Sequence, residues 1–107
     1  MTVPVPCYLV EWYHSAVTDE PLDDTAARLN ECAVLMSAQG SPVRLLNVLA
    51  VPTDEVLFAV FTADSASTVT QTCDRAGIPA QRVTTATEID LLRMPARSTS
   101  SVLAASA

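Results

Sequence analysis

Residues 56–79 constrain the fold of this chain more than any other stretch. The segment begins with six consecutive apolar residues, 56–61, which are rich in β-branched and aromatic side chains and too few for a typical helix. We therefore expect a strand. Because side chains alternate between the faces of a strand, both faces of this one are apolar: Val56, Phe58 and Val60 on one, Leu57, Ala59 and Phe61 on the other.

A helix is predicted directly after this strand. Asp64 or Ser65 can cap its first turn by accepting a hydrogen bond from a free backbone N–H. Gly77 can take the left-handed conformation that ends a helix, and Pro79 cannot continue one. Between these signals one apolar face recurs at helical spacing, made of Ala66, Val69, Cys73 and Ala76.

The remaining elements are predicted on either side of this unit. A first helix starts between Thr18 and Asp23, with Thr18, Asp19 and Asp23 as candidate caps, and ends near Gln39. Its buried stripe is formed by Leu22, Ala26, Leu29, Ala33 and Met36. In chain order, the other segments are an extended lead-in at 1–6, strands at 7–13 and 43–51, a turn at 52–55, and a half-polar strand at 83–89 near a sheet edge.

This order of elements predicts an α+β fold of the ferredoxin-like type, β-α-β-β-α-β. Such a chain forms one four-stranded antiparallel sheet with both helices on one face. A chain of 107 residues has room for one domain, which we place at residues 7–93. Residues 94–107 have the composition of a flexible tail.

The second face of the sheet is the main functional clue in the sequence. A solvated face normally gives polar alternation along each strand, and the first three strands lack it. Half of the residues are apolar and only 17% are charged, so we expect a second copy or another protein to cover that face. The candidate interface residues are Tyr8, Trp12, Leu46, Val48, Phe58 and Val60.

Charge and composition exclude several classes of partner. The net charge is −6, and only six basic residues are present, which argues against nucleic acids and anionic membranes. No basic, apolar leader or membrane-length apolar run is found, so we expect a cytoplasmic protein. Three cysteines at spacings that match no metal or redox motif indicate free thiols, with a Cys32–Cys73 pairing as the alternative.

Residues capable of catalysis are few. His14, the single histidine, follows Glu11 closely, so the pair is a candidate general base with an orienting carboxylate. The two glycines, Gly40 and Gly77, both stop helices, which leaves no phosphate-binding loop and predicts no nucleotide cofactor. A lone loop histidine is more often without a catalytic role, so the acid–base set is thin.

Two segments resemble a known family. The sequences YLVEWY at 8–13 and RAGIPAQRV at 75–83 resemble a small bacterial family of ferredoxin-like domains that includes nickel-binding-like proteins and many uncharacterised actinobacterial members. The resemblance spans roughly residues 7 to 90 and implies a dimeric α+β protein that sometimes binds metal through histidines and carboxylates. Thr72 stands where the family often has a histidine, and Trp12 where a basic residue is frequent.

Three functional hypotheses follow. The favoured one is a non-enzymatic binding or interaction module that acts as a homo-oligomer or as a small subunit of a larger assembly. The second is a cofactor-independent enzyme of the dimeric α/β-barrel type that uses His14 and Glu11 on a small ligand. The third, implied by the resemblance, is a nickel or other divalent-metal site between subunits, built from His14 with Glu11 or Glu88.

Overall fold

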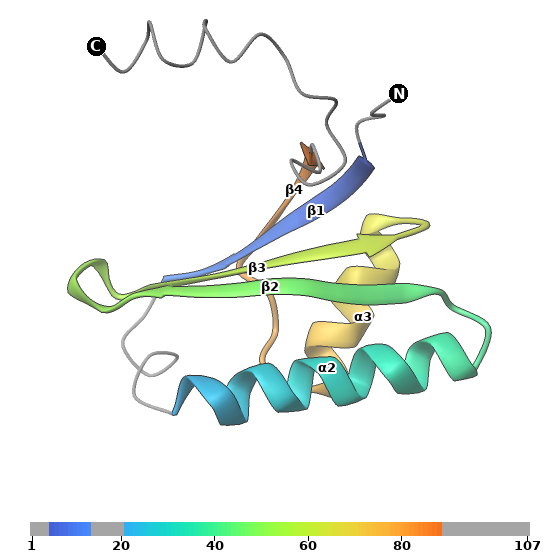
Figure 1. Cartoon of the computed structure of the whole chain (residues 1–107), viewed down its shortest axis with the longest axis horizontal. Helices are drawn as coiled ribbons and strands as arrows, with labels where there is room; N and C mark the ends of the chain where they lie inside the picture. Colours follow the sequence, from blue (N-terminus) through green and yellow to red (C-terminus); the bar gives the residue numbers. More distant parts are fainter. Residues whose placement is uncertain (1–4, 14–20, 89–107) are drawn as a thin grey trace, which may run out of the picture.

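The computed structural model describes residues 5–13 and 21–88. Its elements follow the predicted order β-α-β-β-α-β (Figure 1). In chain order they are β1 (Val5–Trp12), α2 (Leu22–Ala38), β2 (Val43–Val51), the 3₁₀ turn η1 (Pro52–Asp54), β3 (Val56–Ala63), α3 (Ala66–Arg75) and β4 (Arg82–Glu88). The predicted tail at 94–107 and most of the predicted lead-in lie outside the described residues.

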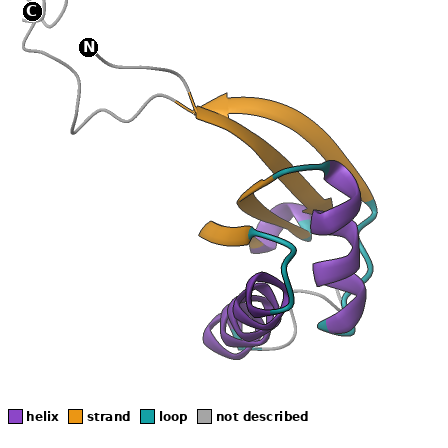
Figure 2. Cartoon of the chain, turned by 90° about the vertical axis from the view of Figure 1, so that its right-hand side faces the viewer, coloured by secondary structure: helices purple, strands orange, loops and turns teal. Residues whose placement is uncertain are grey.

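The four strands form one antiparallel sheet in the order β2-β3-β1-β4. Both helices cover the same side of this sheet, and Figure 2 shows the strands and the helices as two layers. The predicted ferredoxin-like α+β fold is therefore confirmed, including the position of β4 at an edge. Among the described residues, none of the helices has the length and apolar character needed to cross a membrane.

Helix α2 differs from its prediction at the start. Its N-cap position is Pro21, without a side-chain cap, and Asp23 lies inside the first turn, so the proposed Asp23 cap is wrong; Thr18 and Asp19 lie outside the described residues. Leu22, at the helix end, is 41% exposed instead of buried, and Thr25 is buried in its place. Leu29, Ala33 and Met36 are buried as predicted, whereas Ala26 is only half-buried.

Helix α3 has the predicted ends. The Ser65 hydroxyl oxygen accepts a hydrogen bond from the backbone N–H of Thr68 at 3.3 Å. At the other end Gly77 has φ +77°, and the N–H of Ile78 reaches back to the carbonyl of Cys73 at 3.0 Å. This bond pattern satisfies a carbonyl that the last helical turn leaves free, and it folds the buried Ile78 onto the core.

A β-bulge interrupts the hairpin between β2 and β3. Leu45 pairs with Phe61, but the next pair joins Asn47 to Val60, so Leu46 is an extra residue in β2. After this insertion, side chains of β2 change faces relative to a regular strand. Val48 and Ala50, opposite Ala59 and Leu57, consequently turn toward the helices.

The core fills the space between the sheet and the two helices. Trp12 is its largest side chain and is 1% exposed. Its indole N–H lies 3.1 Å from the carbonyl oxygen of Ile78 and 3.0 Å from that of Pro79. A buried indole needs such an acceptor, and here the chain between α3 and β4 supplies it. Trp12 therefore links β1 to the segment that leads into β4.

Candidate functional site

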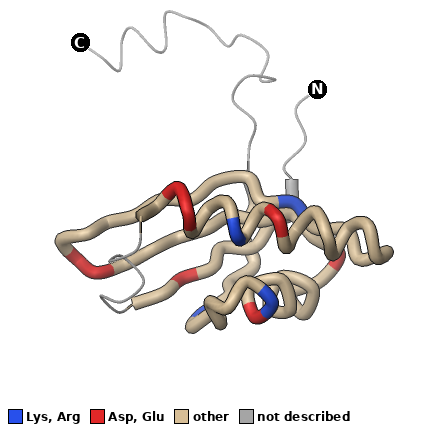
Figure 3. The backbone as a smooth tube through the Cα atoms, turned by 90° about the horizontal axis from the view of Figure 1, so that it is seen from below, with Lys and Arg blue, Asp and Glu red and all other residues tan. Residues whose placement is uncertain are grey.

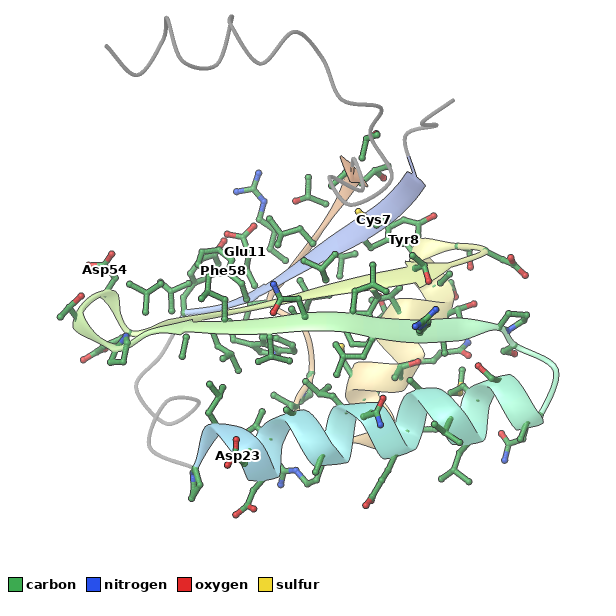
Figure 4. All side chains as sticks on the ribbon, viewed as in Figure 1. Cys7, Tyr8, Glu11, Asp23, Asp54 and Phe58 are labelled. Carbon is green, nitrogen blue, oxygen red and sulfur yellow. The ribbon has the colours of Figure 1, made fainter. Side chains whose placement is uncertain are left out.

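The face of the sheet that turns away from the helices, called the open face below, is the most distinctive surface of the molecule. Strand register assigns its members, because residues directly opposite each other share a face. Leu9 pairs with Val60, and both Glu11 and Leu49 pair with Phe58. Figure 4 shows Glu11 and Phe58 on the side of the sheet opposite α2. No helix or strand among residues 5–13 and 21–88 covers this face (Figure 2).

The centre of the open face is apolar and hollowed. A shallow hollow of about 270 Å³ lies among Leu9, Asn47, Leu49, Phe58 and Val60. Leu49 is 57% exposed, although it is a large apolar side chain in a strand. Among the described residues of this lining, Asn47 alone is polar. Exposed apolar surface of this kind, in the middle of a sheet, is typical of an interaction site.

A polar cluster borders the apolar centre where β1 ends. The Tyr13 hydroxyl donates a hydrogen bond to Oε1 of Glu11 at 2.6 Å, and Nε of Arg82 lies 3.6 Å from Oε2 of the same carboxylate. The backbone N–H of Tyr13 donates to Oε1 of Gln81. The Glu11 side chain is only 13% exposed, so these neighbours replace much of its hydration.

The pKa of the Tyr13 phenol is raised above 10.0 within this cluster. The largest cause is its hydrogen bond to Glu11, since the proton that forms the bond would be lost on ionisation; desolvation acts in the same direction. Arg82 opposes the shift. Both oxygens of Glu11 are therefore engaged, one by Tyr13 and one by Arg82, which differs from a free carboxylate waiting to orient a general base.

The structure divides the six predicted interface residues between different surfaces. Phe58 and Val60 lie on the open face, as a covered second face requires. Tyr8, Trp12 and Val48 instead pack against the helix-facing core, Trp12 as a fully buried member and the other two at its margin. Leu46 lies at the bulge, beside α2. The prediction that Tyr8, Trp12, Val48 and Leu46 lie on the second face is therefore wrong.

The bulge explains why part of the prediction was wrong. Regular alternation would place Leu46, Val48 and Ala50 on one face, whereas the extra residue returns Val48 to the face of Leu45. The residues that replace them on the open face are Asn47 and Leu49 from β2 and Leu9 from β1. The sequence places Leu9 and Trp12 on opposite faces of β1 but does not indicate which face the helices cover, and the position of Leu49 depends on the bulge.

The residues of the enzymatic and metal hypotheses are not brought together in the described part of the chain. His14 lies outside it. Glu11 is paired with Arg82, whereas the backbone of Glu88 is paired with Val5 at the far end of β4, about 20 Å away at the usual rise per residue. Among residues 5–13 and 21–88, no three His, Cys, Asp or Glu side chains cluster as a metal site would require.

Thr72 and Cys73 are buried beneath the sheet, and Cys32 packs against the same core. Thr72, at the position where the resemblance places a histidine, is fully buried, and its hydroxyl donates to the carbonyl of Thr68 at 2.8 Å. All three cysteines are free thiols, as expected, and the alternative Cys32–Cys73 disulfide is not formed. Burial raises the pKa of Cys73 to about 12, with smaller contributions from Asp74 and Cys32, so this thiol is held protonated.

Comparison with known proteins supports the fold and adds no activity. Neither protein-family models nor curated proteins match this sequence. Among solved structures, the chain is similar to SCO4226 from Streptomyces coelicolor A3(2), with a TM-score of 0.54 and 15% sequence identity over 73% of this chain and 91% of that one. At this identity the similarity shows a shared fold alone.

Proposed function

We propose that this chain is a non-enzymatic interaction module that forms a homodimer by packing the open faces of two sheets together. The observation that carries the proposal is the apolar centre of the open face, where Leu49 is 57% exposed beside a hollow of about 270 Å³. A second copy brings the same protruding side chain and the same hollow, so the surface is self-complementary in a two-fold arrangement.

The size of the open face suits a stable dimer. Four strands about 4.8 Å apart, each about 25 Å long, present a flat footprint of about 500 Å² per copy, or about 1,000 Å² for the pair. Protruding side chains make the accessible surface area larger than this flat value, which brings the total buried area closer to the range of specific interfaces. The buried part would be largely apolar, and such burial stabilises an interface by about 25 cal/mol per Å² before the costs of association.

The distribution of charge also favours a second copy. The chain has a net charge of −6, which would oppose association if the acidic residues lay on the contact surface. Most of those among the described residues lie elsewhere, on the two helices, just before α3 and at the hairpin turn, as Figure 3 shows for the turn at residues 54–55. Glu88 ends β4 in register with Val5, at the end of the sheet away from the apolar centre. Glu11, the acidic residue next to the apolar centre, is already paired with Arg82.

Two matched substitutions test this proposal. Leu49→Glu places a charge at the centre of the open face, and Leu35→Glu places the same charge on α2 at a leucine of nearly equal exposure, 57% against 54%. We expect light scattering to give twice the chain mass of 11.4 kDa for the parent and Leu35→Glu, and a single chain mass for Leu49→Glu, with unchanged circular dichroism in all three.

Two results would contradict the proposal. One is a parent protein that stays monomeric at high concentration. The other is a Leu49→Glu variant that keeps the parent's mass. A Phe58→Glu variant provides a second disruption from β3, so failure of one variant to fold does not decide the outcome.

A further inference from the structure

The outer edge of β2 is a second surface of interest, because no other strand among the described residues pairs with it. β2 is an edge strand, and seven of its nine residues are apolar. Edge strands are usually protected by prolines, lysines or short length. β2 has neither residue and is the longest strand, whereas the opposite edge, β4, is shorter and rich in threonine. The protections within β2 are the bulge at Leu46 and the exposed charge of Arg44 near its start.

One end of this edge is closed by α2. The Ser37 hydroxyl accepts a hydrogen bond from the N–H of Val43 at 3.1 Å and donates one to the carbonyl of the same residue at 2.9 Å. A single side chain therefore occupies the outward backbone groups of Val43 in the way that a neighbouring strand would. These bonds also show that the Val43 backbone groups point away from β3.

The register places further backbone groups on the same outer edge. In an antiparallel sheet, the backbone N–H and C=O groups of successive residues point to alternate sides of the strand. Ala63, opposite Val43, directs these groups away from β2, and so do Ala59 and Leu57, which have the same parity. Their partners, Ala50 and Val48, consequently direct N–H and C=O groups outward. Within residues 21–88, no hydrogen bond joins these outward groups to another element.

A groove lies beside the bulge and reaches this open part of the edge at Val48. It has a volume of about 530 Å³, within the range of peptide and ligand sites, and lies between the first turns of α2 and the middle of β2. Its walls are mostly apolar or small, with one carboxylate and two amides: Leu22, Asp23, Ala26, Ala27 and Asn30 from α2, and Leu45, Leu46, Asn47 and Val48 from β2. The alanines leave the room that a larger side chain would fill.

We propose that the groove binds an extended peptide segment of a partner protein, which adds to the sheet as a fifth strand beside β2. Backbone hydrogen bonds to Val48 and Ala50 would supply affinity, and an apolar side chain would enter the groove. Asp23, which is exposed on the groove wall, selects a basic residue in that segment.

The groove also orients the peptide. Ser37, near the end of α2, contacts Val43 at the start of β2, so the helix and the strand run in opposite directions. The first turn of α2 therefore lies near the later part of β2. A peptide that pairs antiparallel to β2 has its N-terminus beside the later part of β2. Its basic residue is therefore expected at its N-terminal end, next to Asp23.

This site does not depend on the proposed dimer. The dimer would use the surface above the plane of the sheet, whereas the peptide extends the sheet within its plane. Both surfaces can be occupied together. A variant that disperses the dimer, Leu49→Glu, should therefore keep its peptide binding.

The experiment uses a fluorescein-labelled peptide of sequence RTVTVTVT and its acidic counterpart ETVTVTVT, titrated with the full chain by fluorescence anisotropy. We expect saturable binding of the basic peptide below about 1 mM. Ala27→Phe fills the groove and should weaken binding at least about tenfold, while Ala38→Phe, an exposed alanine near the other end of α2, should not change it.

A charge reversal tests the role of Asp23. Asp23→Arg should reverse the preference from the basic to the acidic peptide, whereas Asp24→Arg, next in sequence but outside the groove lining, should preserve it. Hydrogen exchange should show slower exchange of the Val48 and Ala50 amides in the presence of the basic peptide.

Three outcomes would overturn the proposal. The first is absence of saturable binding below about 1 mM. The second is equal binding by Ala27→Phe and Ala38→Phe. The third is slow hydrogen exchange of the Val48 and Ala50 amides in Leu49→Glu without peptide, with protection that increases with protein concentration. This result would show that β2 of a second copy pairs with the edge instead of a peptide.

Discussion

The two faces of the sheet are both apolar, yet among the described residues the helices cover only one of them. On the covered face, Trp12, Leu57 and Phe61 are at most 1% exposed. On the open face, Phe58 and Val60 remain partly exposed and Leu49 is more than half exposed. Apolar content is thus similar on the two sides, while the solvent contact differs because both helices lie on one side.

This difference separates residues that hold the fold from residues available for binding. A side chain that the helices cover contributes to the free energy of folding in the isolated chain. A similar side chain on the open face contributes little until a partner covers it. The two faces therefore predict opposite effects of mutation, one on stability and the other on association.

The largest effect is expected from Trp12→Ala on the covered face. Removing the indole leaves a cavity and leaves the carbonyls of Ile78 and Pro79 without their donor, which should lower the free energy of unfolding by about 3–5 kcal/mol. In the Phe58→Glu background, which is expected to be monomeric, Leu49→Ala should change the free energy of unfolding by less than about 0.5 kcal/mol. Urea denaturation measures both. Similar losses for the two variants would remove the distinction between the faces.

The second expected effect concerns the Cys73 thiol in α3. With its pKa raised from 9.0 to about 12 by burial, the thiolate is about a thousandfold scarcer than in an unfolded chain near pH 8. Alkylation of the native protein should therefore modify the half-buried Cys32 first and reach Cys73 only through unfolding. Mass spectrometry of iodoacetamide-treated protein locates the label. Early labelling of Cys73 would mean that the covered face opens readily.

The smallest effect concerns Tyr13 on the open face. Glu11→Gln should lower the pKa of Tyr13 toward 10.0, because a neutral amide holds the phenol proton less strongly. An absorbance titration of the phenolate in a Tyr8→Phe background measures the shift. The raised pKa means that this contact contributes to stability below about pH 10 and is lost as pH rises through the folded-state value.

Two variants sharpen that titration. Arg82→Gln should raise the Tyr13 pKa further, since the cation opposes the shift in the parent. Opposite movements in Glu11→Gln and Arg82→Gln would confirm the cluster. Identical titrations in the parent and both variants would mean that the phenol does not contact Glu11 in solution.

Local signals predicted most of the fold. Ser65 and Gly77 bound α3 as expected because an N-cap oxygen and a left-handed glycine act within a few residues of the helix end. The start of α2 was less predictable. Several residues around 18–23 could serve as caps, and the observed position, Pro21, has no side-chain donor or acceptor to signal it. The exposure of Leu22 follows from that starting point.

The candidate site was predicted only in part. The fold type predicted a face without helices, and the lack of polar alternation predicted that this face is apolar. Phe58 and Val60 do lie on it, and their part in an interface stays a prediction. Trp12 and Tyr8 were assigned to the wrong face, because nothing in β1 alone indicates which of its two faces the helices cover. Val48 failed for a different reason, the insertion of Leu46 into the ladder.

By itself, the sequence determined the strands, the ends of α3 and the order β-α-β-β-α-β, because hydrogen-bonding and steric preferences of neighbouring residues decide backbone conformation locally. Only the tertiary structure decided which apolar residues are core and which are surface. That choice depends on strand register, on the bulge at Leu46 and on the side where α2 and α3 pack, all of which arise from contacts between residues far apart in the chain. In a strand that is apolar on both faces, such as β3, these contacts alone distinguish a stabilising side chain from a binding one.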